Sequence, residues 1–268
     1  RIEITLRCAG HDYPASYFVR KGNREKPVVV LIPGFGMSPH MWADTFETHV
    51  SDSFLGESTV IVLGFPGSES GSPVPWLGWQ TLHERTVLAQ TIIQKACQDQ
   101  CMPENAELVL CGFSLGAVIA RQLLLSLHRR VKGLYLYAPV PNGWLALHTF
   151  SFWRFAIFAL PAMIVSLLTG RSVSVPYHVA RNGFANGNDV PELQRLGTDS
   201  SIIFLQLLFL YRGFEVHRVW KEHYWSGVFN VYLAEEDRIC PLSAQDDARY
   251  EKIPHQSFLT DRSHFFWT

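Results

Sequence analysis

Residues 108–127, LVLCGFSLGAVIARQLLLSL, predict a strand that turns abruptly into a helix. The apolar run at 108–111 is short, which is typical of a strand buried on both faces of a sheet. Residues 115–127 are rich in Leu and Ala and contain no Pro, so they favour a helix. Between the two elements lies the pentapeptide GFSLG, whose central residue is Ser114.

The two glycines of GFSLG suit a sharp turn that lifts the Ser114 side chain clear of the sheet. Such a turn strains the central residue, and side chains at Gly112 and Gly116 would collide with their surroundings. The turn also places Ser114 at a helix N-terminus, where free N–H groups favour developing negative charge. We interpret Ser114 as a catalytic nucleophile, with a plain structural turn as the alternative.

The sequence on both sides of this turn alternates between strand and helix patterns. Strands that alternate with helices form parallel β-α-β units with right-handed crossovers. The predicted class is therefore α/β, with a mostly parallel, doubly wound sheet. Strands are predicted at 1–8, 13–19, 28–32, 60–63, 108–111, 134–137, 228–234 and 256–260, and helices at 82–96 and 115–127.

The alternation stops after residue 141, and residues 142–220 predict helical segments without a strand. We interpret 142–220 as a helical cap inserted into a core made of 1–141 and 221–268. The apolar run at 155–168 is shorter than the about 20 residues that span a bilayer, so a transmembrane helix is rejected. Three interpretations stay open: packing of the cap on the core, lining of a pocket for an apolar acyl group, and peripheral contact with a membrane. The candidate substrate-binding residues are Trp144, Phe155 and Phe158.

Composition limits the classes of partner and cofactor. The chain has 268 residues, of which 47% are apolar, and a net charge of −1, so it lacks the basic field that nucleic-acid binding requires. Its 5 cysteines form no CxxC pair, so we expect free or structural thiols and no metal site. Unpaired thiols favour a reducing compartment, the cytoplasm. The chain begins with Arg1 instead of Met, which suggests that a preceding segment was trimmed.

Together with GFSLG, two further motifs resemble the α/β-hydrolase superfamily, and the resemblance covers nearly the whole chain. LIPGFGMS at 31–38 is similar to the HGxG-type oxyanion loop of that family. GFPGSESGS at 64–72 is similar to its D-x-P-G-x-G-x-S loop, with Gly64 where the family has Asp. The resemblance implies an oxyanion hole made of the backbone N–H groups of Phe35 and Leu115. A single donor of this kind contributes about 10²–10³ in rate.

Two late motifs complete the resemblance by supplying an acid and a histidine. AEEDRICP at 234–241 is similar to the family's G-x-x-D-x-x-x-P segment, which implies Asp237 as the acid. DRSHFF at 261–266 is similar to its G-H-F segment, which implies His264 as the base. Ser, acid and His then follow one another in the order of α/β-hydrolases. The residues that compete for the two roles are Glu235, Glu236 and His255.

The resemblance implies an enzyme that needs no metal or cofactor. His264 would take the proton of Ser114, Ser114 would attack a carbonyl carbon, and water would release the acyl group from the acyl-enzyme. The expected function is a serine hydrolase of the carboxylesterase, lipase or thioesterase kind, acting on a small-molecule ester or thioester with an apolar acyl part. An acyltransferase, and a lyase or non-enzymatic member of the fold, are the alternatives. The sequence leaves the oligomeric state open.

Overall fold

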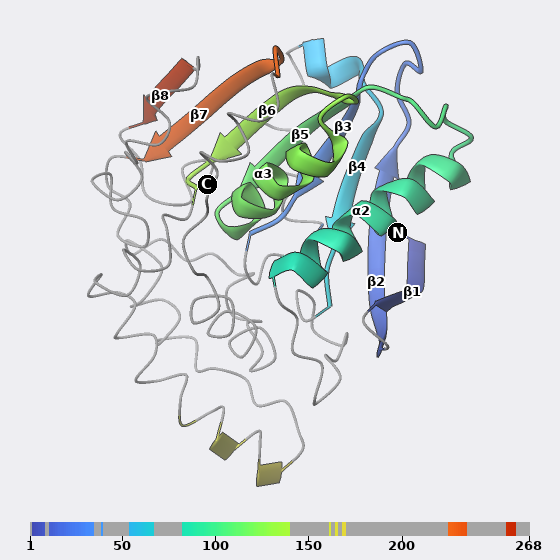
Figure 1. The fold of residues 1–268 in the computed structure, drawn as a ribbon, viewed down its shortest axis with the longest axis vertical. Helices are drawn as coiled ribbons and strands as arrows, with labels where there is room; N and C mark the ends of the chain where they lie inside the picture. The colour runs from blue at the N-terminus through green and yellow to red at the C-terminus, as the bar shows by residue number, and fades with distance from the viewer. Residues whose placement is uncertain are drawn as a thin grey trace.

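The structure is a computed structural model, which describes residues 2–8, 11–34, 39, 54–66, 82–139, 161, 164–165, 168–169, 225–234 and 256–260. These residues form one sheet with helices packed on it (Figure 1). Its strands are β1 (Ile2–Cys8), β2 (His11–Arg20), β3 (Val28–Ile32), β4 (Val60–Gly64), β5 (Leu108–Phe113), β6 (Val131–Tyr137), β7 (Val228–Ala234) and β8 (Gln256–Thr260). The helices are α2 (Leu82–Asp99), α3 (Leu115–Leu127) and the short 3₁₀ helix η1 (Phe54–Glu57).

The sheet has the strand order β1-β2-β4-β3-β5-β6-β7-β8. All neighbouring pairs from β4 to β8 are parallel, whereas β1 and β2 are antiparallel at one edge. The strand β3 lies between β4 and β5, so the strand order reverses there. In open parallel sheets, the carboxyl ends of the strands beside such a reversal form the usual ligand site.

The predicted α/β class with a mostly parallel, doubly wound sheet is confirmed. Four predicted elements (28–32, 115–127, 228–234 and 256–260) have the predicted bounds. The strand β6 begins three residues before the predicted start, because its ladder with β5 continues back to the pair Leu108 and Val131. Apart from residues 161, 164–165 and 168–169, the predicted cap at 142–220 lies outside the described residues, so its boundaries stay predictions.

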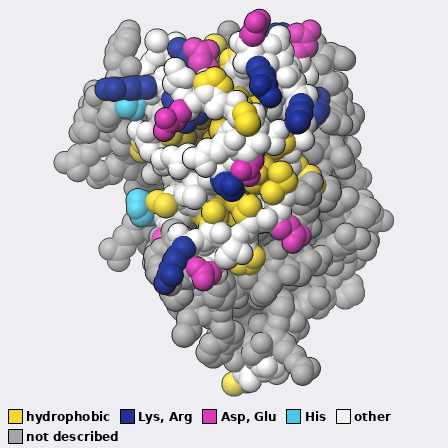
Figure 2. Space-filling model, turned by 90° about the vertical axis from the view of Figure 1, so that its right-hand side faces the viewer, with side chains coloured by type: hydrophobic (Ala, Val, Ile, Leu, Met, Phe, Trp, Pro, Cys, Tyr) yellow, Lys and Arg dark blue, Asp and Glu magenta, His cyan; other side chains and the backbone are white. Residues whose placement is uncertain are grey.

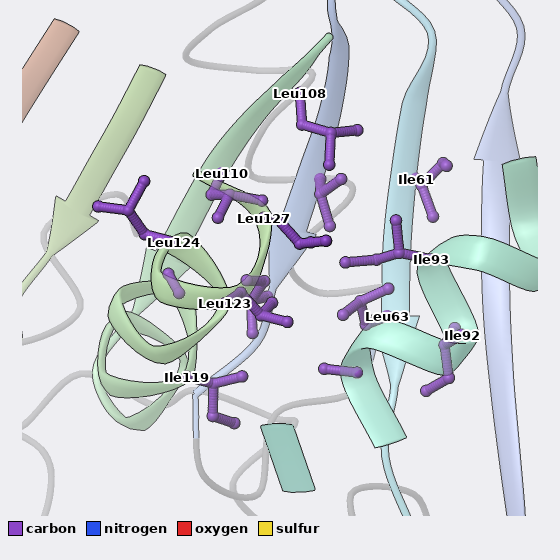
Figure 3. Close-up of a cluster of buried hydrophobic side chains, with 14 of the residues drawn as sticks. Ile61, Leu63, Ile92, Ile93, Leu108, Leu110, Ile119, Leu123, Leu124 and Leu127 are labelled. Carbon is purple, nitrogen blue, oxygen red and sulfur yellow. The ribbon is translucent and has the colours of Figure 1, made fainter. Parts of the chain in front are cut away.

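The main core lies between one face of the sheet and the helices α2 and α3 (Figure 3). Alternate residues of the strands point to this face, and the fully buried aliphatic side chains interlock with those of both helices. Each such side chain stabilises the fold by about 1.5–3 kcal/mol relative to exposure. The labelled members of the core are Ile61, Leu63, Ile92, Ile93, Leu108, Leu110, Ile119, Leu123, Leu124 and Leu127.

The end of α2 carries local backbone strain. The N–H of Met102 donates to the Cys97 carbonyl (2.9 Å), and the N–H of Cys101 donates to the Gln98 carbonyl (3.0 Å). These two bonds form a Schellman motif, whose left-handed residue is usually Gly. That residue here is Cys101, with a φ of 52°. A side chain at positive φ is strained, because its Cβ crowds the neighbouring carbonyl.

We expect Cys101→Gly to stabilise the protein by about 0.5–1 kcal/mol, because glycine adopts this conformation without strain. The gain should raise the melting temperature by about 1–4 °C in thermal unfolding monitored by circular dichroism. Gln100→Gly is the matched control, since residue 100 has no positive φ and glycine there only adds entropy to the unfolded chain. An equal or larger gain from Gln100→Gly would contradict the explanation.

Candidate active site

Ser114 occupies the junction between β5 and α3 in a strained conformation. Its φ is 51° and its ψ is −116°, a combination that costs on the order of 1–3 kcal/mol for a residue with a Cβ. The Ser114 N–H donates to the carbonyl of Tyr137 on β6 (2.8 Å), and the Ser114 carbonyl accepts from the N–H of Ala117 on α3 (3.1 Å). These bonds hold the strained residue between a strand and a helix.

The hydroxyl of Ser114 takes no part in capping the helix that follows it. Serine at an N-cap ordinarily accepts a hydrogen bond from an N–H of the first helical turn. Ser114 is the N-cap residue of α3, yet it makes no side-chain cap bond, and only 7% of its surface is exposed. The first turn of α3 also contains no acidic residue, so the positive end of the helix is not neutralised locally.

Two glycines make the close packing around Ser114 possible. A Cβ built on Gly112 would lie 2.5 Å from the carbonyl oxygen of Gly116. A Cβ built on Gly116 would lie 2.1 Å from the carbonyl oxygen of Ile32 and 2.6 Å from that of Pro33. Real Cβ atoms do not approach backbone oxygens this closely. The N-terminus of α3 therefore packs directly against the end of β3. Side chains at Gly112 and Gly116 would collide with their surroundings, as predicted from the two glycines of GFSLG.

The loop that follows β3 contacts the Ser114 turn. In the parallel ladder between β3 and β5, Ile32 pairs with Gly112, so Pro33 and Gly34 continue alongside Phe113 and Ser114. A Cβ built on Gly34 would lie 3.1 Å from the Ser114 Cβ and 2.8 Å from Cδ1 of Phe113. The first glycine of the predicted oxyanion loop is thus next to Ser114.

Of the two predicted oxyanion donors, Leu115 is among the described residues and Phe35 is not. Leu115 is the first residue of α3, and the first N–H groups of a helix have no partner inside it. Its N–H is therefore free of intrahelical bonding and adjacent to Ser114. Phe35 lies outside the described residues, one position after Gly34.

The predicted triad acid and base, together with the substrate-binding residues, also lie outside the described part of the chain: Asp237, His264, Trp144, Phe155 and Phe158. The strands that precede the acid and the base are described. β7 ends at Ala234 and β8 ends at Thr260, which are three and four residues before Asp237 and His264. Both strands are parallel to β6, so they end at the same edge of the sheet as the Ser114 turn.

A tyrosine pair that no sequence motif contains lies next to Ser114. The rings of Tyr137 on β6 and Tyr232 on β7 stack with centroids 4.5 Å apart and planes 8° apart. Burial, followed by the neighbouring Cys111 and tyrosines, raises the pKa of Tyr137 well above its ordinary value, and burial raises the pKa of Tyr232. Both phenols therefore stay neutral at physiological pH. Only the pairing register of β6 and β7, in which these residues are partners, reveals the pair.

A buried arginine contacts the first two residues after β4. The guanidinium of Arg85 on α2 lies 5.1 Å from the centre of the Phe65 ring, and its Nη2 donates to the Pro66 carbonyl (3.1 Å). Burial lowers the pKa of Arg85 to about 10, so the side chain stays charged at neutral pH. The contact joins the start of α2 to the carboxyl end of β4 and thereby supports the same edge of the sheet.

The structure also explains the glycine that departs from the family's loop motif. A Cβ built on Gly64 would lie 2.2 Å from the Oγ of Ser16, and these residues are partners in the antiparallel ladder between β2 and β4. Ser16 is buried. Its hydroxyl therefore occupies the volume that the family's aspartate side chain would need.

The amino-acid sequence matches the model of the Alpha/beta hydrolase family over residues 29–268. The chain belongs to the alpha/beta hydrolase family. None of the curated proteins matches this alpha/beta hydrolase significantly. Among the described residues, no group of three or more His, Cys, Asp or Glu side chains is placed to hold a metal ion.

Solved structures share this alpha/beta hydrolase fold at low sequence identity. A carboxylesterase of the ammonia-oxidizing thaumarchaeon Nitrososphaera gargenis is 10% identical, with a TM-score of 0.70 over 98% of this chain and 92% of that one. An esterase from Exiguobacterium antarcticum is 13% identical, with a TM-score of 0.64 over 98% and 93%. The thioesterase domain of the curacin biosynthetic pathway is 14% identical, with a TM-score of 0.64 over 98% and 93%. At these identities the likeness concerns the fold.

Proposed function

We propose that this alpha/beta hydrolase is a serine hydrolase that cleaves carboxylic esters or thioesters with an apolar acyl part. The proposal rests on the backbone conformation of Ser114 and on its uncapped hydroxyl. This residue is held in a strained conformation at the N-terminus of α3, and its hydroxyl is not used for capping. Strain of this kind persists where the surrounding structure enforces it and is concentrated at active sites. The proximity of Gly34 supports an oxyanion loop beside the same residue.

In the proposed reaction, Ser114 attacks the carbonyl carbon of the substrate while His264 takes the hydroxyl proton. Asp237 holds the imidazole in one tautomer and stabilises its positive charge. The N–H groups of Phe35 and Leu115 donate to the oxyanion of the tetrahedral intermediate. His264 then gives its proton to the leaving alcohol or thiol, and the acyl group stays on Ser114. Water, activated by His264, releases the acid and restores the enzyme.

The apolar acyl group is proposed from the composition of the cap. Trp144, Phe155 and Phe158 belong to a segment dense in aromatic residues, and pockets for small molecules are mostly lined by apolar and aromatic side chains. The esterase and thioesterase names of the structural neighbours agree with a carbonyl substrate.

We further propose a reducing compartment, the cytoplasm, since Cys97, Cys101 and Cys111 are free thiols.

Hydrolysis of p-nitrophenyl esters of increasing acyl length tests the apolar pocket. We expect kcat/KM to rise from acetate to a medium or long chain, since each buried methylene contributes about 0.8 kcal/mol, or roughly fourfold. A preference for acetate would overturn the apolar-acyl assignment.

In the same assay, an added alcohol acceptor shows whether water is the preferred acceptor. Formation of a new ester in place of the free acid would indicate an acyltransferase.

A further inference from the structure

A strip of apolar side chains in the cap segment is exposed to water. Residues 161, 164, 165, 168 and 169 are helical, and the Thr169 Oγ1 donates to the Val165 carbonyl (2.8 Å). Positions 161, 164, 165 and 168 have the spacing of one helix face. We call Ile164, Val165 and Leu168 the cap strip. Their exposed fractions are 53%, 46% and 82%.

The cap strip differs from the other exposed apolar side chains that the structure describes. Those are Ile2, Val87 and Val228, and each belongs to a different element. Isolated apolar residues are normal on a protein surface, whereas contiguous ones mark sites of interaction. In Figure 1 these helical residues lie at the lower end of the view, away from the sheet, and Figure 2, turned about the same vertical axis, shows a hydrophobic side chain among the described atoms at its lower end.

The segment around the cap strip has a positive charge, although the whole chain has a net charge of −1. No Asp or Glu occurs in the sequence between Glu107 and Asp189. The cap part of this interval contains Arg154, Arg171 and Arg181, and residues 155–170 between the first two are uncharged. An apolar helix face within a basic segment complements a membrane that carries anionic lipids.

We propose that the cap strip docks on the surface of an anionic lipid bilayer. The uncharged run at 155–170 is shorter than the about 20 residues needed to cross one, so the helix lies on the surface. No helix within the described ranges is long and apolar enough to cross a membrane. A second copy of the chain fits the strip poorly. Three aliphatic side chains offer far less than the about 800 Å² that each partner buries in a stable interface, and the basic segments of two copies would repel each other.

Co-sedimentation with vesicles tests the proposal. The full chain is mixed with vesicles of phosphatidylcholine alone or with an equal part of phosphatidylglycerol. We expect binding to the mixed vesicles to be at least about tenfold stronger and to weaken with salt. Ile164→Asp/Leu168→Asp should weaken it by at least about a hundredfold, because two apolar anchors are lost and two negative charges are added. Val87→Asp on α2, an exposed apolar residue of the fold, is the matched control and should bind as the unmodified protein does.

Equal binding by the unmodified protein and the double variant, or no preference for the anionic vesicles, would overturn the proposal. Analytical ultracentrifugation measures the oligomeric state of the unmodified protein and of the double variant. A dimer that the double variant dissociates would assign the strip to a second copy of the chain. If the double variant melts early, Leu168→Ser replaces it and should still weaken binding about tenfold. Sedimentation measures binding without turnover, so its result does not depend on the role of Ser114.

Discussion

Ser114→Ala is expected to lower kcat/KM for p-nitrophenyl esters by at least about 10⁴-fold, the scale found when a serine nucleophile is removed. The loss follows because no acyl-enzyme forms without the hydroxyl. The fold should persist, because the Ser114 hydroxyl makes no cap bond and alanine bears the same strain at a φ of 51°. Steady-state kinetics together with thermal unfolding measure both effects.

The control for this variant is Ser126→Ala on the same helix. Ser126 is exposed, and its Oγ donates to the Leu123 carbonyl (3.1 Å). This variant removes one hydroxyl from α3 without touching the Ser114 turn, so activity should stay within about twofold. Ester hydrolysis by Ser114→Ala at more than a tenth of the original rate would rule out Ser114 as the nucleophile.

Gly116→Ala is expected to damage stability and activity together. The added methyl group would lie 2.1 Å from the Ile32 carbonyl oxygen, so the start of α3 must move away from the end of β3. Overpacking against backbone costs about 1–3 kcal/mol, which lowers the melting temperature by about 2–10 °C. The same movement displaces Ser114 and the Leu115 N–H from Gly34. A misplacement of about 1 Å lowers the rate by about 10²-fold.

Gly133→Ala on β6 is the matched control, because the atoms nearest to its added methyl group are side-chain atoms, of Tyr135 at 3.0 Å and of Val109 at 3.4 Å, and not backbone oxygens. We expect it to change stability by less than about 1 kcal/mol and to leave kcat/KM within about threefold. If Gly116→Ala keeps full activity, the turn does not position Ser114 as described.

The fold was readable from the sequence because its determinants are local. Strands such as 28–32 and 60–63 are short apolar runs bounded by polar or turn residues, which is the pattern of strands inside a sheet. The start of β6 was not readable, because Lys132 and Gly133 interrupt its apolar run. Pairing with β5 extends the strand across them. Register is a tertiary property that overrides the local pattern.

The candidate site likewise combines features that local sequence predicts with contacts that only the folded chain creates. Ser114 was predictable because a strand, a turn and a helix adjacent in sequence define its environment. The contact of Ser16 with Gly64, and that of Arg85 with Phe65, join segments far apart in the chain. Gly64 and Phe65 belong to the motif at 64–72, but their partners Ser16 and Arg85 belong to no motif. The roles of Phe35, Asp237 and His264 rest on motif resemblance and on strands that end at one edge of the sheet, and they stay predictions.

Labelling with a fluorophosphonate probe tests the central claim most directly, because the probe reacts with an activated serine hydroxyl and needs no known substrate. Mass spectrometry of the digested protein should find one label, on the peptide that contains Ser114. The label should be absent from Ser114→Ala and present on Ser126→Ala. A protein that takes up no label, or a label that persists in Ser114→Ala, would contradict the assignment of Ser114 as the nucleophile.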